Sequence, residues 1–351
     1  MSVFSKFRDF LHRHRNKFIV TGVLFTGTFF LLRYAQRRLR DWQEREAKEI
    51  LERTRKQQHF ESTERTCNQT IINLSGALKK SLTKILNTDD IVDTLRGNPD
   101  NKVDLWEKLK IQTFTRACTA IYLQVMLVIT LRIQLNVLGG CLYKDPSLIS
   151  TELQEKYLVI CHSLLNGGVQ NISEIIEKEL IKILRPISLS RQLKLNDIEN
   201  IFYALQTSMV TSNNNPILNF KEHLITTGNK TNNNTPNGNE FFNTMIQDTI
   251  DLLDSDEIKN LANHCVNRGF ALLSDGISEY YLPPQKVMEL PEGAPFVHPS
   301  DIQKPMAKLI PIINGLVGKN TFFDQLTEQL VLNAKVKTLG ANIYECFCST
   351  K

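Results

Sequence analysis

One uncharged segment near the start of the chain limits what it can fold into. Residues 18–32 are FIVTGVLFTGTFFLL, and ten of these fifteen residues are Phe, Ile, Val or Leu. A helix needs about 20 apolar residues to cross a bilayer core of roughly 30 Å, and ~17 is the usual lower limit. The segment spans a membrane only if Lys17 and Arg33 extend their charges to the interface, or if Tyr34 and Ala35 are included in the span. We therefore predict a transmembrane anchor over residues 18–35.

Two other interpretations of this segment are weaker. A secretory signal peptide also starts with basic residues, but residues 33–40 are RYAQRRLR, which offers no cleavage site between small residues. A buried core helix would not have basic residues at both ends. An uncleaved anchor is favoured, and because both flanks are basic, charge does not set its orientation.

The basic residues of the chain gather around the same segment. Residues 1–56 contain 14 Lys and Arg against 6 Asp and Glu, so the charge of +8 there exceeds the +5 of the whole chain. Residues 1–17 form a basic N-terminal segment. Residues 36–58 form a charged helical connector, in which Glu49 and Arg53 are one of several acid-before-base pairs at i,i+4. Basic residues placed next to an anchor favour a membrane surface over a nucleic acid.

The rest of the chain, residues 59–351, is predicted to be a helical domain. Apolar residues recur at intervals of three and four with almost no strand-like alternation, so the fold class is all-α, a transmembrane helix followed by a bundle of long helices. Residues 117–131 are apolar almost all round, but polar interruptions favour a central helix over a second span. Helices are expected at about 60–86, 89–96, 101–138, 151–166, 169–185, 195–210, 240–255, 256–281 and 321–348.

Two polar stretches interrupt this pattern. Residues 211–240 contain ten Asn, which predicts a disordered insertion. Residues 283–305 contain six of the twelve prolines, which predicts an exposed loop. The Gly139-Gly140, Gly167-Gly168 and Asn314-Gly315 pairs are expected at helix ends.

The sequence offers little chemistry. No phosphate-binding, nucleophile-elbow or zinc-protease motif occurs, and the seven cysteines lack the spacing of a metal site or of a disulfide framework. We therefore expect no enzyme, no metal and no cofactor. The remaining enzymatic alternative would use an adjacent thiol and imidazole, at Cys161-His162 or His264-Cys265.

One group of residues is better suited to binding a protein. Trp106, one of two tryptophans, follows a short helix that ends at Arg96. A Trp in a first helical turn packs into its own core more often than not. The alternative is a surface groove that would accept an amphipathic helix with acidic flanks. Its floor would be Leu95, Trp106 and Leu109, and its rim would be Arg96, Lys102 and Lys110.

Several long motifs resemble the peroxin-3, or peroxisomal biogenesis factor 3, family. They are FESTERTCNQT (60–70), NKVDLWEKLKIQTFTR (101–116), LRIQLNVLGG (131–140), CVNRGF (265–270) and LIPIINGL (309–316). The resemblance runs from about residue 8 to 348. It implies a single-pass peroxisomal membrane protein with a cytosolic helical domain, and it implies that the protein can pass through the endoplasmic reticulum on its way to the peroxisome.

The resemblance also implies a partner. The family docks a farnesylated cytosolic chaperone of the peroxin-19 type, which delivers newly made peroxisomal membrane proteins. The residues that form the family's binding groove correspond in this chain to Leu95, Arg96, Lys102, Trp106, Leu109 and Asn136. At the position of Arg96 the family commonly has Lys. The competing hypothesis is a membrane tether that binds lipid, or a cytoskeletal or organelle-inheritance partner. Neither a nucleic acid nor a small-molecule substrate is expected.

Overall fold

The computed structural model describes residues 15–212, 215–224, 236–281 and 301–349. The chain divides into two compact units, Met1–His59 and Phe60–Lys351. One helix, α2 (Arg15–Ile85), contributes to both units. Each unit is described separately below.

The described part of the first unit is helical. Side chains from residue 28 to 55 are exposed, and Glu49 and Arg53 form the expected ion pair at 3.9 Å. Phe29, Phe30 and Leu31 are between 57% and 69% exposed. The side chains of residues 18–27, which begin the predicted anchor, lie outside the described residues.

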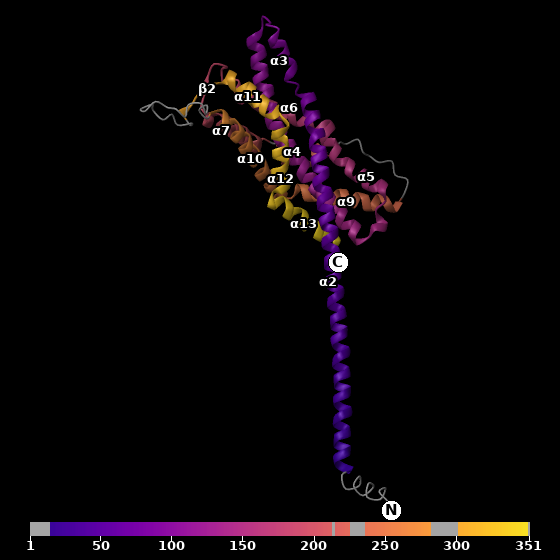
Figure 1. The fold of residues 1–351 in the computed structure, drawn as a ribbon. Coiled ribbons are helices and arrows are strands. Elements are labelled where there is room, and N and C mark those ends of the chain that lie inside the picture. The colour runs from indigo at the N-terminus through magenta and orange to yellow at the C-terminus, as the bar shows by residue number, and fades with distance from the viewer. Residues whose placement is uncertain (1–14, 213–214, 225–235, 282–300, 350–351) are drawn as a thin grey trace, which may run out of the picture. The chain divides into compact units, whose positions relative to one another are not determined.

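The second unit is built around one helix, α4 (Lys102–Lys144), which is buried on all sides from Thr113 to Gly140. Helices α6, α10, α11, α12 and α13 all pack on it (Figure 1). Among the described residues, α4 is the one helix long and apolar enough to cross a membrane, and 89% of its most apolar stretch is buried inside the protein. The expectation of a central helix at 117–131 is therefore confirmed.

Most of the other elements follow the predicted order. They are α3 (Asp89–Arg96), η1 (Pro146–Leu148), α5 (Thr151–Leu158), η2 (Val159–Cys161), the π-helical turn η3 (Leu164–Gly168), α6 (Val169–Leu184), β1 (Gln192–Leu193), α7 (Leu195–Thr211), α8 (Phe220–Leu224), α9 (Pro236–Asp254), α10 (Asp256–Ser278), η4 (Glu279–Tyr281), β2 (Lys304–Pro305), α11 (Met306–Gly318), α12 (Asn320–Leu332) and α13 (Ala334–Cys348). The two short strands pair antiparallel, with Gln192 opposite Pro305.

The structure corrects the helix boundaries in three places. Helix α11 was not predicted, because Pro311 and Gly315 lie inside it and both residues normally interrupt a helix. The single helix expected at 321–348 is two helices, and the Asn333 side chain caps the second by accepting hydrogen bonds from the backbone N–H groups of Lys335 and Val336. The helix expected at 151–166 breaks into α5 and two short turns.

Two of the three glycine-containing pairs do not end helices as predicted: Gly139-Gly140 and Asn314-Gly315 lie inside helices, whereas Gly168 is the last residue of η3. Gly139 and Gly140 lie inside α4, and a Cβ atom on Gly140 would stand 2.7 Å from Cβ of Phe347 on α13. A Cβ on Gly139 would stand 2.6 Å from Cγ2 of Thr63. These glycines therefore allow neighbouring helices to approach closely, which is a tertiary requirement.

The two polar stretches are only partly described. The prediction of disorder over 211–240 is wrong for residues 215–224, because Ile217 and Phe220 are fully buried and α8 forms there. It is also wrong from residue 236, where α9 begins. Residues 225–235 lie outside the described residues. So do residues 283–300 of the Pro-rich loop, whose end forms strand β2.

Candidate partner-binding surface

The residues singled out around Trp106 lie at the end of α3 and on the first turns of α4, and a short turn joins the two helices (Figure 1). Asn98 makes this turn possible, because its φ of 59° lies in the left-handed region that Asn tolerates better than most residues. The start of α3 is fixed by a buried polar contact: Thr88 Oγ1 donates to Asn314 Oδ1 at 2.8 Å and accepts from Arg116 Nη1 at 2.8 Å. The contact joins α3, α4 and α11.

Trp106 takes an intermediate position. Its ring is half-buried, and like Leu95 and Leu105 it packs against the hydrophobic core. Val103, one turn earlier on the same helix, is 68% exposed. Leu109, expected in the groove floor, is buried in the core. The apolar surface here consists of Leu95, Val103 and Trp106. Together with Arg96 and Lys102, they are called the α3–α4 surface below.

Sequence reasoning missed Val103. The signal was present, because Val103 and Trp106 are three residues apart and lie on the same side of a helix. The exposure of a valine in a first helical turn cannot be predicted from the sequence, because it depends on where the neighbouring helices end.

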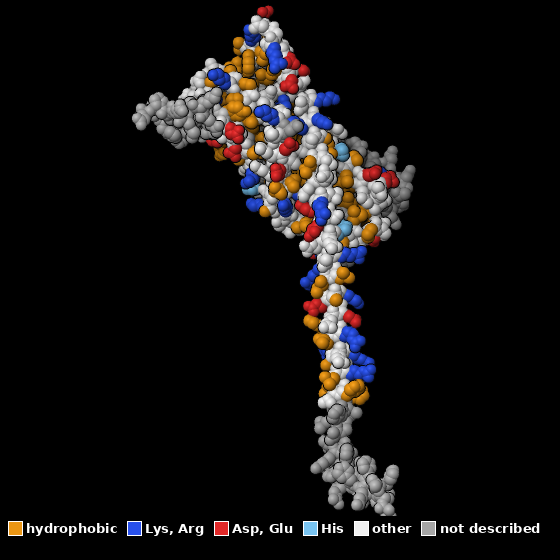
Figure 2. Space-filling model, viewed as in Figure 1, with side chains coloured by type: hydrophobic (Ala, Val, Ile, Leu, Met, Phe, Trp, Pro, Cys, Tyr) orange, Lys and Arg blue, Asp and Glu red, His pale blue; other side chains and the backbone are white. Residues whose placement is uncertain are grey.

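The charge on this end of the unit is mixed. Arg96 and Lys102 are exposed as predicted, and Arg96 forms an exposed ion pair with Asp93 at 2.9 Å. From Asp89 to Lys110 the sequence has six acidic and four basic residues. Figure 2 shows hydrophobic, acidic and basic side chains together around α3. Arg96 and Lys102 therefore do not form a uniformly basic rim, because acidic residues stand among them.

Lys110 is not a rim residue. Its side chain is fully buried, and Nζ donates to the backbone oxygens of Leu184 at 3.1 Å and Ile187 at 2.7 Å. It also lies 2.6 Å from a carboxylate oxygen of Glu107. Because the last carbonyls of a helix lack partners within the helix, a lysine there satisfies them. Lys110 therefore joins α4 to the end of α6, and the prediction of a surface role was wrong.

Asn136 also lies elsewhere. It is fully buried on α4, and its Nδ2 donates to the backbone oxygen of Arg132 at 2.8 Å. At ~1.5 Å of rise per residue, Asn136 is about 45 Å along the helix from Trp106. A single surface groove cannot contain both residues. The groove position that the resemblance implied for Asn136 is therefore wrong, because α4 continues far into the core.

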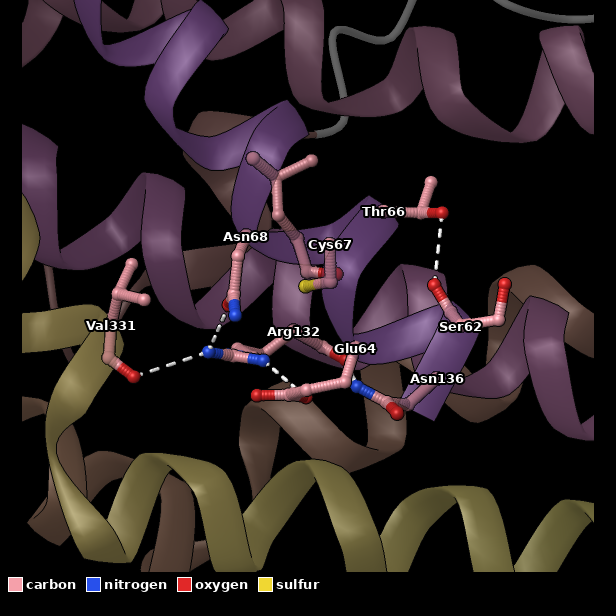
Figure 3. Close-up of polar contacts among 9 residues, drawn as sticks. Ser62, Glu64, Thr66, Cys67, Asn68, Arg132, Asn136 and Val331 are labelled. Carbon is pink, nitrogen blue, oxygen red and sulfur yellow. Dashed lines mark hydrogen bonds and ion pairs between the residues drawn. The ribbon is translucent and has the colours of Figure 1, made fainter. Parts of the chain in front are cut away.

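Asn136 belongs instead to a buried polar cluster around Arg132 (Figure 3). The Arg132 side chain is fully buried, and its Nη1 lies 2.5 Å from a carboxylate oxygen of Glu64. Its Nη2 donates to Asn68 Oδ1 at 2.6 Å and to the backbone oxygen of Val331 at 3.3 Å. One guanidinium thus joins α2, α4 and α12, which is a structural role.

The two thiol–imidazole pairs are poorly arranged for catalysis. Cys161 and Cys265 are buried whereas His162 and His264 are exposed, so neither pair faces one site. Burial raises the pKa of both thiols to about 11. Burial likewise raises the pKa of Cys67, beside Arg132, to about 12. Within the described residues, no group of three His, Cys, Asp or Glu side chains is arranged to hold a metal ion.

Taken together, the described residues define an almost entirely helical protein with one long buried central helix and a partly apolar surface at the end where α3 meets α4. A family model described as Peroxin-3 matches residues 9–101, 97–145 and 142–344. Peroxisomal biogenesis factor 3 of Rattus norvegicus is 32% identical over 97% of this chain and 96% of its own length. The Homo sapiens protein of the same name is 31% identical over the same shares. That of Debaryomyces hansenii is 26% identical over 62% of this chain.

The chain belongs to the peroxin-3 family. Membership gives it a role in peroxisome biogenesis and indicates a peroxisomal membrane protein.

Proposed function

We propose that the chain is a docking receptor on the peroxisomal membrane for a farnesylated cytosolic chaperone of the peroxin-19 type. The observation that carries this proposal is the α3–α4 surface, where a half-buried Trp106 lies beside the exposed Val103. A large aromatic side chain that packs partly against the core and has an exposed apolar neighbour is typical of the centre of a protein interface. An amphipathic helix of the chaperone would lay its apolar stripe on Leu95, Val103 and Trp106.

The first unit would place this surface at the organelle. Exposed Phe29, Phe30 and Leu31 are what a lipid-facing helix presents, and basic residues flank them on both sides in sequence. Residues 18–35 would form the anchor and residues 59–351 the cytosolic domain. Protease protection on intact organelles tests this orientation: a C-terminal domain that resists protease without detergent would contradict it.

Binding is tested with the full-length chain in lipid nanodiscs and a labelled peptide from the chaperone's N-terminal amphipathic helix. Trp106→Ala should weaken binding by at least ~2 kcal/mol, about 30-fold, because a central aromatic anchor is lost. Val103→Glu should also weaken it by about tenfold, and its exposure predicts an unchanged melting temperature.

The matched control is Trp42→Ala, because Trp42 is the other tryptophan and is 57% exposed in the first unit. It should bind like wild type. Normal binding by Val103→Glu and by a folded Trp106→Ala would refute the surface assignment. If the chain bound anionic liposomes in a salt-sensitive manner, bound no chaperone peptide, and were indifferent to Trp106, the tether hypothesis would replace the proposal.

A further inference from the structure

A second surface of the helical unit has the form of a binding cleft. It lies between α2, from Ile72 to Thr83, and α12, from Phe323 to Leu332, and has a volume of about 720 Å³. Ile72 and Thr83 are eleven residues apart, so at ~1.5 Å of rise per residue the α2 side of the cleft is about 16 Å long, or three helical turns. None of the residues assigned to the α3–α4 surface lines it.

Hydrogen bonds hold the two walls of the cleft together at its floor. Ser75 Oγ lies 2.9 Å from Thr327 Oγ1 and donates to Gln124 Oε1 on α4 at 3.1 Å. Gln124 Nε2 in turn donates to Thr327 Oγ1 at 2.9 Å. Because these polar groups satisfy one another, the floor does not demand a polar ligand. Apolar groups of an occupant would meet Ile72 and Leu332, which are 54% and 57% exposed.

Gly76 keeps one wall of the cleft open. It lies well inside α2, where a glycine costs roughly 1 kcal/mol relative to alanine. A Cβ atom on Gly140 would strike a neighbouring helix, whereas one on Gly76 would meet nothing within 4 Å. Packing within the chain therefore does not explain this glycine. The missing side chain leaves the α2 backbone open to an occupant of the cleft.

The two walls carry opposite charges. Lys79 and Lys80 line the α2 side, and Asp324 and Glu328 line the α12 side. Lys79 already has partners within the chain: its Nζ donates to the Gly318 oxygen at 3.0 Å and lies 5.6 Å from the centre of the Phe323 ring. Lys80 and Glu328 are exposed and form no ion pair within the described part of the chain.

We propose that this cleft docks an amphipathic helix of a partner protein, of about three turns, with acidic residues on its flank facing α2 and basic residues on its flank facing α12. The length of the cleft, its apolar lining and the open space at Gly76 fit a helix seated between two others. A lipid or other anionic amphiphile would require one sign of charge, whereas the cleft presents both. The site is separate from the chaperone surface and does not depend on that proposal.

The test is a selection on the full-length chain in nanodiscs. The probe is a displayed library of 18-residue helices with Leu at i, i+3, i+4 and i+7, in which each flanking position is randomised between Glu and Lys. Binders should carry Glu on one flank and Lys on the other. Gly76→Leu fills the cleft and should weaken their binding at least tenfold. The charge exchange Lys80→Glu with Glu328→Lys should reverse the preferred flanks.

Gly315→Leu is the matched control, because Gly315 also lies inside a helix, is exposed, has nothing within 4 Å of a built Cβ, and does not line the cleft. It should leave Kd within twofold of wild type, and both glycine variants should melt no lower than wild type. Trp106→Ala should also leave these binders unaffected.

Three results would overturn the proposal. The first is a selection that yields no binder sensitive to Gly76→Leu. The second is Gly76-sensitive binding of an 11-carbon fluorescent fatty acid without any such helical peptide, which would make the cleft a lipid site. The third is concentration-dependent dimerisation that Gly76→Leu abolishes, since the occupant would then be a second copy of the chain.

Discussion

Arg132 offers the sharpest test of how the helical unit is held together. Arg132→Met removes the charge and keeps an unbranched side chain in a site that is fully buried. The variant leaves the Glu64 carboxylate, whose side chain is 19% exposed, without its cation. It also removes the donor to Asn68 Oδ1 and to the Val331 oxygen. Three helices lose one shared contact.

Two opposing terms set the size of the effect. Charges 2.5 Å apart attract by roughly 7 kcal/mol at an effective dielectric constant of about 20. The cost of removing both ions from water opposes this by several kcal/mol. Breaking a buried pair by removing one partner usually costs about 3–5 kcal/mol, which we expect for Arg132→Met. For a unit of this size that corresponds to a melting temperature lower by roughly 10 °C.

The assay is guanidinium and thermal unfolding of the full-length chain in detergent micelles, followed by far-UV circular dichroism. Arg96→Met is the matched control, because it removes the same group from an ion pair whose side chains are 76% and 69% exposed. It should change the free energy of unfolding by less than about 0.5 kcal/mol.

A double-mutant cycle separates the pair from general damage to the core. Glu64→Gln alone leaves a buried guanidinium without its counter-ion and should also be destabilising. The double variant of Arg132→Met and Glu64→Gln should cost at least ~2 kcal/mol less than the sum of the single variants, because no uncompensated charge remains. Additive costs, or an Arg132→Met variant as stable as Arg96→Met, would show that the ion pair does not hold these helices together.

Three further outcomes are expected. Lys110→Met should destabilise the unit by about 1–3 kcal/mol in denaturant unfolding, because the carbonyls at the end of α6 lose a buried donor. A loss of partner binding without a loss of stability would instead support the surface role first predicted for this lysine. Gly140→Ala should lower stability by ~1–3 kcal/mol, since its Cβ would overlap α13, and a neutral result would mean that α13 can shift. In thiol labelling of the native chain at pH 8, the exposed Cys346 should react first, while Cys118, fully buried and with its pKa raised by that burial, should react only on unfolding; early labelling at Cys118 would contradict its burial.

Sequence periodicity predicted helices α3, α6, α7 and α10 well, because each has a clear apolar stripe or a breaker at its end. It failed where a residue acts through a tertiary contact. Gly140 looks like a helix end in sequence, and only the position of α13 shows that the helix continues and needs the missing side chain. Pro311 concealed α11 for the same reason, since packing on α4 compensates for the lost hydrogen bond.

The candidate site shows the same division. Composition and spacing alone identified an all-α chain, an apolar segment with basic flanks, and a Trp at the start of the longest buried helix. These properties are local, because they depend on residues within a few turns of one another. The roles of Lys110, Asn136 and Val103 were decided only by the tertiary structure. Lysine and asparagine become structural when a helix end or a backbone oxygen lies within reach, and a valine stays exposed when no helix covers it. The surrounding helices therefore determine the environment of each side chain.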